Sequence, residues 1–85
     1  MTTYEFLTMA TIIEDRAAMD RRYPVKSVAD ASEMLDRLNA FIRYCNRAIR
    51  VANADARDDD AARIAKLVAA AKRYRDFSYD DARAI

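Results

Sequence analysis

The sequence contains no glycine, no histidine and no tryptophan, and it has one proline and one cysteine. Without glycine, few residues suit the positive φ angles that tight hairpin turns and phosphate-binding loops require. Folds rich in β-hairpins and dinucleotide-binding folds are therefore excluded. Without histidine and with one cysteine, the chain also lacks the usual zinc ligands, the Ser-His-Asp and Cys-His catalytic arrangements, and an intramolecular disulfide.

The sequence also has no large excess of basic over acidic residues or the reverse, and it has no long run of apolar residues. Fifteen basic residues stand against fourteen acidic ones, so a net charge of +1 gives no strong attraction to nucleic acid or to an acidic membrane. No apolar run approaches the roughly 18 residues of a membrane-spanning helix, and the first residues lack the basic segment of a signal peptide. We expect a cytoplasmic protein without a membrane partner, located in the host cytoplasm if a phage encodes it.

The residues that are abundant favour helices. Eighteen of the 85 residues are alanine, 53% are hydrophobic and 34% are charged. This composition is too apolar for a disordered segment and too evenly charged for a membrane protein. Because a chain of this length has room for one core, we expect a single helical domain over residues 1–85.

Apolar periodicity predicts a first helix over residues 3–23 and a second over residues 28–53. Thr2 begins the first with a capping-box spacing, and Pro24 stops it because its ring clashes with the preceding helical turn. Ser27 repeats the cap before the second helix. About 25 residues at 1.5 Å rise make this second helix the longest element, roughly 38 Å in length.

The second helix carries a nearly heptad apolar stripe with Leu38 and Ile42 at its centre, and Asn53 is a plausible left-handed terminator. A third helix is predicted over residues 60–76, and Ser78 predicts a short helical turn after it. Short connections favour antiparallel neighbours. The predicted fold is therefore all-α, an antiparallel three-helix bundle with a short C-terminal helical turn.

No group of residues predicts catalysis. Cys45 lies in the middle of the second helix, where a free cysteine usually behaves as a small buried hydrophobe, and no base is present to activate it. Asp55 and the aspartates at 58–60 could hold Mg²⁺ or Ca²⁺, but helix capping explains them more simply. We predict a protein that is not an enzyme and that has no cofactor and no metal site.

Two basic segments are the most informative feature of the sequence. Residues 37–54 contain four arginines and residues 61–75 contain five basic residues, and neither segment contains an acid. Arg43, Arg47 and Arg50 recur at i, i+4 and i+7 opposite the apolar stripe, without the acid one helical turn away that would pair with them.

By contrast, Arg37 has Glu33 four residues before it, and Arg63 has Asp59 in the same position. These two arginines are therefore expected to form ordinary ion pairs within their own helices.

Three interpretations of the basic face formed by Arg43, Arg47 and Arg50 remain open: a solvated charge stripe, a protein-binding face, and a nucleic-acid-binding face. Arginine and tyrosine dominate protein-binding hot spots, and arginine also holds phosphates. The candidate partner-binding residues are Arg43, Tyr44, Arg47, Arg50, Lys66 and Arg73. A second apolar patch on the first helix is either core or a dimer interface, and it consists of Ile12, Met19 and Tyr23.

In size and composition the chain resembles the small helical proteins that phages and mobile elements encode to block host complexes, among them anti-CRISPR proteins. The resemblance implies a non-enzymatic inhibitor or adaptor that binds a larger protein complex. The alternatives are a nucleic-acid-binding regulator that uses both basic segments, and a structural subunit that self-associates, for example as a homodimer, through the patch on the first helix.

Overall fold

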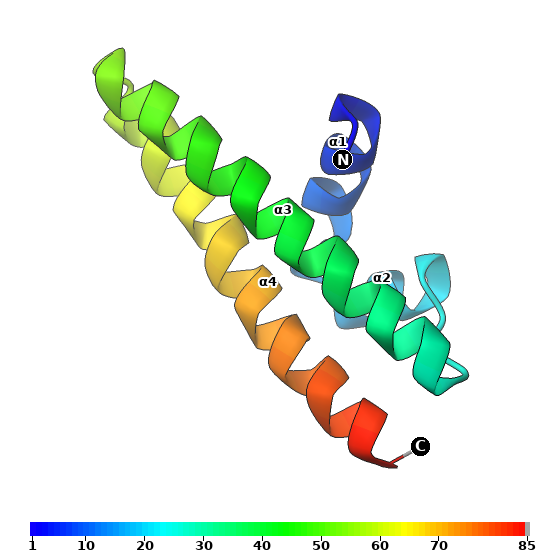
Figure 1. The fold of residues 1–85 in the computed structure, drawn as a ribbon. Coiled ribbons are helices and arrows are strands. Elements are labelled where there is room, and N and C mark those ends of the chain that lie inside the picture. The colour runs from blue at the N-terminus through cyan, green and yellow to red at the C-terminus, as the bar shows by residue number, and fades with distance from the viewer. Residues whose placement is uncertain (85) are drawn as a thin grey trace.

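The computed structural model describes the backbone of residues 1–84 and the side chains of residues 1–76. This part of the chain contains four helices and no strands, which confirms the all-α prediction. The helices are α1 (Thr3–Ile12), α2 (Arg16–Arg22), α3 (Val28–Ala54) and α4 (Asp58–Ala84). The two long helices, α3 and α4, form an antiparallel hairpin, and α1 and α2 lie on one side of it (Figure 1).

The predicted continuous helix over residues 3–23 is wrong, because the chain breaks between α1 and α2. The backbone of Asp15 is extended, and its carboxylate accepts a hydrogen bond from the Ala18 backbone N–H at 3.2 Å. Asp15 is thus an N-cap, which competes with continuation of the preceding helix. The break turns Met19 toward the same core as Met9 and Ile13, although the three do not share a stripe on one straight helix.

The first long helix, α3, begins and ends close to the predicted residues. Ser27 caps α3 by accepting a hydrogen bond from the Asp30 backbone N–H at 3.1 Å, as its sequence pattern predicts. The left-handed residue that follows α3 is Ala56, with a φ of 56°, and not Asn53, which lies within the helix.

The last helix is longer than predicted. It begins at Asp58 instead of residue 60 and continues to Ala84, so Ser78 does not begin a separate turn. No proline or glycine interrupts the sequence over this range, which leaves the backbone hydrogen bonds of the helix unbroken. The predicted three-helix bundle with a terminal turn is therefore a long hairpin covered by two short helices.

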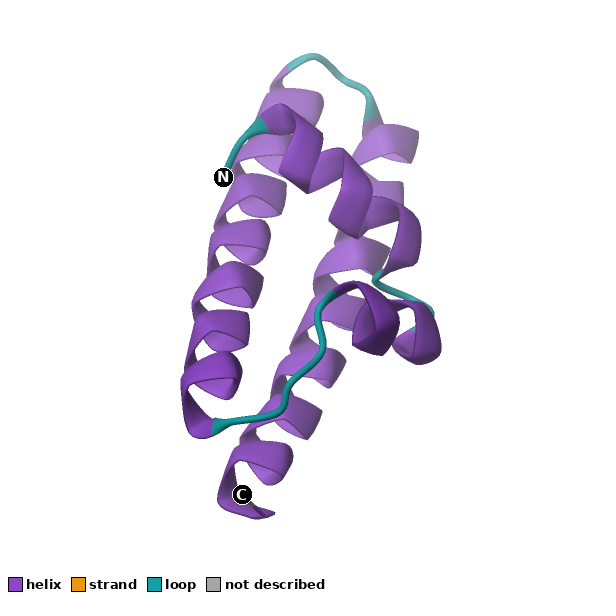
Figure 2. Ribbon diagram, turned by 90° about the vertical axis from the view of Figure 1, so that its right-hand side faces the viewer, coloured by secondary structure: helices purple, strands orange, loops and turns teal. Residues whose placement is uncertain are grey.

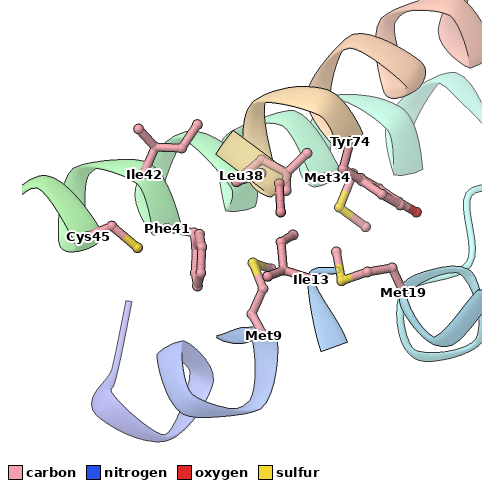
Figure 3. Packing of buried hydrophobic residues seen from close by; sticks show 11 residues of the cluster. Met9, Ile13, Met19, Met34, Leu38, Phe41, Ile42, Cys45 and Tyr74 are labelled. Carbon is pink, nitrogen blue, oxygen red and sulfur yellow. The ribbon is translucent and has the colours of Figure 1, made fainter. Parts of the chain in front are cut away.

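The core lies where α1 and α2 pack on the hairpin. Figure 3 shows Met9, Ile13 and Met19 pointing toward side chains of α3 and α4. Leu38 is fully buried, as predicted. The core consists of Met9, Ile13, Met19, Met34, Leu38, Phe41, Ile42, Cys45, Ala70, Ala71 and Tyr74. The Tyr74 hydroxyl donates a 2.5 Å hydrogen bond to the Asp20 carboxylate, which joins α4 to α2.

The two short helices cover only part of the hairpin. With 27 residues each, α3 and α4 are about 40 Å long, whereas α1 and α2 are about 15 Å and 10 Å. The end of the hairpin at the α3–α4 loop therefore extends past them (Figures 1 and 2). The buried residues at that end are only alanines, Ala52 and Ala61. Among the residues that the structure describes, no helix combines the length and apolar character needed to cross a membrane.

Candidate functional site

The basic face of α3 consists of Arg43, Arg47 and Arg50, and all three side chains are exposed. Within the described side chains, none of the three makes an ion pair or a hydrogen bond. The acids of α1 and of the α3–α4 loop thus leave these charges unneutralised. Like charges one helical turn apart repel by a few tenths of a kcal/mol per pair, so this arrangement does not stabilise the helix.

Tyr44, the fourth predicted residue on α3, has a structural contact of its own. Its ring stacks on Phe6 with centroids 4.3 Å apart, and Phe6 in turn stacks on Phe41 at 5.2 Å. The three rings attach α1 to the middle of α3. Tyr44 is therefore half-buried and holds α1 beside the basic face.

A groove opens next to the basic face, at the end of the hairpin that α1 and α2 leave uncovered. Its volume is about 510 Å³. Its lining combines apolar side chains with three arginines and one aspartate: Tyr44, Arg47, Ala48, Val51, Ala52, Arg57, Asp60, Arg63 and Ile64. We call this the loop-end groove. Arg47 belongs both to the groove and to the basic face.

Ion pairs hold two of the groove arginines in place. The Asp60 carboxylate lies 3.6 Å from the Arg57 guanidinium and 3.4 Å from that of Arg63, and Arg57 also donates a hydrogen bond to Asp55 at 3.4 Å. Arg63 thus pairs with Asp60, three residues before it, and not with Asp59 as predicted.

The predicted pair of Arg37 with Glu33 is confirmed at 3.4 Å. The Arg37 guanidinium also lies 4.4 Å from the centre of the Tyr23 ring, a cation–π distance. Arg37 is therefore a structural residue, in contrast to the three arginines of the basic face.

The two predicted residues on α4 lie outside the loop-end groove. Lys66 and Arg73 are both exposed. Arg73 borders a different, smaller depression of about 140 Å³, together with Ile13 and Glu14 of the α1–α2 region. The six predicted residues therefore do not form one site.

The patch proposed for self-association is mostly covered. Met19 is fully buried, and Ile12 and Tyr23 are half-buried against the core. Met19 is therefore a core residue and not part of an exposed patch. The exposed large apolar side chains of α1 are Tyr4 and Leu7, which are 75% and 57% exposed.

The thiol of Cys45 is buried in the core, and this burial raises its pKa to about 11. A thiol with such a pKa stays protonated near neutral pH and is a poor nucleophile. Of the acids near the α3–α4 loop, Asp55 and Asp60 form ion pairs with arginine, and no group of three potential metal ligands converges within the described part of the chain.

Sequence reasoning missed the groove because its arginines come from three separate places. Arg57 reaches it through the α3–α4 loop, where the Arg57 backbone N–H bonds to the Ala52 carbonyl at 2.8 Å. The only sequence signal was the run of arginine and aspartate at 55–60. Comparisons of the chain with protein-family models, with curated proteins and with solved structures find no match.

Proposed function

We propose that the chain is a non-enzymatic protein-binding module that docks the basic face of α3 on an acidic surface of a larger protein complex. The observation that carries this proposal is the set of three exposed arginines, Arg43, Arg47 and Arg50, which make no ion pair within the described side chains. A partner that supplies carboxylates would remove their mutual repulsion and add charge-assisted hydrogen bonds.

The scaffold suits docking by a preformed face. The three arginines lie on a helix of 27 residues whose opposite side is packed in the core. Little backbone ordering is then needed on binding, which lowers the entropic cost of association. An inhibitor or adaptor that blocks a host complex, as phage-encoded proteins of this build do, is the form of the function that we propose.

The test is capture of a partner from lysate of the cells in which the chain acts. Immobilised parent protein is compared with a variant that carries Arg43→Glu, Arg47→Glu and Arg50→Glu, and bound proteins are identified by mass spectrometry. We expect one protein or complex to be retained by the parent and lost with the variant. Capture of duplex DNA instead, with an affinity that falls steeply with salt, would contradict the proposal.

Self-association is a second candidate function, and a different observation favours it. Tyr4 and Leu7 lie one turn apart on α1 and are both largely exposed. These two side chains would offer a second copy an apolar surface to cover. Light scattering during size-exclusion chromatography would reveal a dimer, and Leu7→Glu would return it to a monomer.

A further inference from the structure

The loop-end groove exists because α1 and α2, which cover one side of the α3–α4 hairpin, are too short to cover all of it. The hairpin is about 40 Å long, and α1 and α2 pack on it only away from the α3–α4 loop (Figure 1). At the loop end, α3 contributes Ala48 and Ala52, whose side chains are single methyl groups. Two helices that meet through small side chains, without a third helix above them, leave a hollow.

The floor of this hollow is apolar. Val51 is 51% exposed although it is aliphatic, and Ile64 on α4 is half-buried. Covering a side chain of this size yields about 25 cal/mol for each Å² of apolar surface removed from water. The groove therefore favours an occupant with an aliphatic side chain.

The rim of the groove is basic. Arg47 has no ion pair within the described side chains, whereas Arg63 pairs with Asp60 and Arg57 pairs with both Asp55 and Asp60. The unpaired positive charge of the lining is therefore that of Arg47. Complementarity then requires carboxylates beside the apolar side chain of the occupant.

We infer that the loop-end groove binds a short acidic segment of the partner protein, in which an aliphatic anchor is flanked by carboxylates. This inference rests on the proposed function and names the chemistry of the partner. The anchor lies between Val51 and Ile64, and the carboxylates reach Arg47 on one helix and Arg63 on the other. A nucleic acid fits less well, because the one aromatic ring in the lining, Tyr44, is already stacked on Phe6 and is not free to stack on a base.

The test uses a synthetic peptide of about 12 residues with a central Leu-Leu pair and two glutamates on each side. Amide chemical shifts of ¹⁵N-labelled protein are followed during titration. We expect saturable shifts at Val51, Ala52 and Ile64. Replacing the glutamates by glutamine, or the leucines by serine, should each weaken binding at least roughly tenfold, which corresponds to about 1.4 kcal/mol.

Two protein variants control this titration. Ala48→Leu fills the groove and should abolish peptide binding, whereas Ala29→Leu makes the same change at an exposed site on the same helix and should leave it intact. No shifts at the groove residues with about 1 mM peptide, or equal binding of the glutamine peptide, would overturn the inference.

A further variant separates this inference from the proposed function. Arg43→Gln with Arg50→Gln removes two charges of the basic face but changes none of the residues that line the groove. Because glutamine places no carboxylate one helical turn from Arg47, this variant should weaken peptide binding much less than replacing the peptide's glutamates does. If this double variant abolishes partner capture while the peptide fails to bind the parent protein, the proposed function stands and the inference about the groove falls. If capture persists and the peptide binds, the proposed function falls.

Discussion

At the scale of single residues, Ala56 has the backbone conformation least suited to its side chain. Its φ of 56° lies in the left-handed region, where a Cβ atom costs roughly 1 to 2 kcal/mol. The Ala56 N–H bonds to the Asn53 carbonyl at 3.1 Å and the Arg57 N–H to the Ala52 carbonyl at 2.8 Å. This is the Schellman ending of a helix, in which glycine usually occupies the position of Ala56.

Ala56→Gly should therefore stabilise the protein. We expect a gain of about 0.5 to 1 kcal/mol, because relief of the left-handed penalty exceeds the added entropy of glycine in the unfolded chain. Chemical denaturation measures it. Ala65→Gly, at an exposed position inside α4, is the matched control and should cost about 1 kcal/mol. Equal losses for the two variants would show that residue 56 is not left-handed.

Burial of Cys45 also predicts a pH dependence of stability. Burial raises the pKa of the thiol from its ordinary value of 9.0 to about 11 in the folded protein, so the unfolded chain loses its proton first. The buried neutral thiol makes its full contribution to the free energy of unfolding below about pH 9, and this contribution is lost as the pH rises toward 11. Between about pH 8 and pH 10.5 this loss amounts to about 2 kcal/mol.

A Cys45→Ala variant removes this titration. Its free energy of unfolding should start lower, because of the smaller side chain, but should fall by about 2 kcal/mol less than that of the parent over the same pH interval. All other side chains are the same in the two proteins, so the difference between the two curves reports the thiol. Parallel pH curves would contradict the burial of the thiol.

At the scale of elements, the break between α1 and α2 decides how the N-terminal residues reach the core. Ile13 is the C-cap of α1 and Asp15 is the N-cap of α2, so the two helices need not share one axis. Tyr74 then holds α2 against α4 through Asp20. The cap of Asp15 is therefore expected to stabilise the whole fold and not α2 alone.

Asp15→Ala should lower the free energy of unfolding by about 1 kcal/mol, the usual effect of removing an N-cap side chain. Glu14→Ala is the control, because Glu14 is exposed and does not cap the helix, and it should change stability by no more than about 0.5 kcal/mol. Thermal melting of both variants measures the difference. Equal melting temperatures would indicate that the first segment is one continuous helix.

Sequence reasoning succeeded where local chemistry decides an element. The caps at Thr2 and Ser27 and the apolar stripe through Leu38 each follow from nearby residues. It failed at Asp15, because an exposed aspartate fits a continuous helix as well as a cap, and only tertiary packing of Met19 distinguishes the two. It failed at Ser78 because a cap pattern does not break a helix that nothing else interrupts.

At the scale of the whole molecule, the fold is an elongated hairpin with a core toward one side. Its extents are 45 × 22 × 19 Å. The large buried side chains come from all four helices where α1 and α2 pack, and Leu38 lies among them (Figure 3). Stability should therefore depend strongly on that region.

Leu38→Asp should cost at least about 3 kcal/mol, because it removes a buried side chain and places a charge without a partner in the core. Leu7→Asp makes the same change at a position that is 57% exposed, and it should cost less than about 0.5 kcal/mol. Urea denaturation compares the two. A Leu38→Asp protein as stable as the parent would contradict the position of the core.

The candidate site could be predicted only in part, because one portion of it depends on how whole helices are arranged. The basic face of α3 follows from the spacing of Arg43, Arg47 and Arg50 within one helix. The loop-end groove requires the length of α1 and α2 and the course of the α3–α4 loop, which bring Arg57 and Arg63 to Arg47. No local pattern in the sequence contains that information.

Binding of a protein by the basic face of α3 is tested by the affinity for the purified partner. The Arg43→Glu, Arg47→Glu, Arg50→Glu protein is compared with an Arg21→Glu, Lys26→Glu, Lys72→Glu control. The control makes the same change in net charge at three other exposed positions.

Melting and binding are measured on the same samples. We expect both variants to remain folded and only reversal of the α3 arginines to weaken binding, by at least about 100-fold, or 2.7 kcal/mol. A folded variant with reversed α3 arginines that binds its partner at full affinity would contradict this expectation.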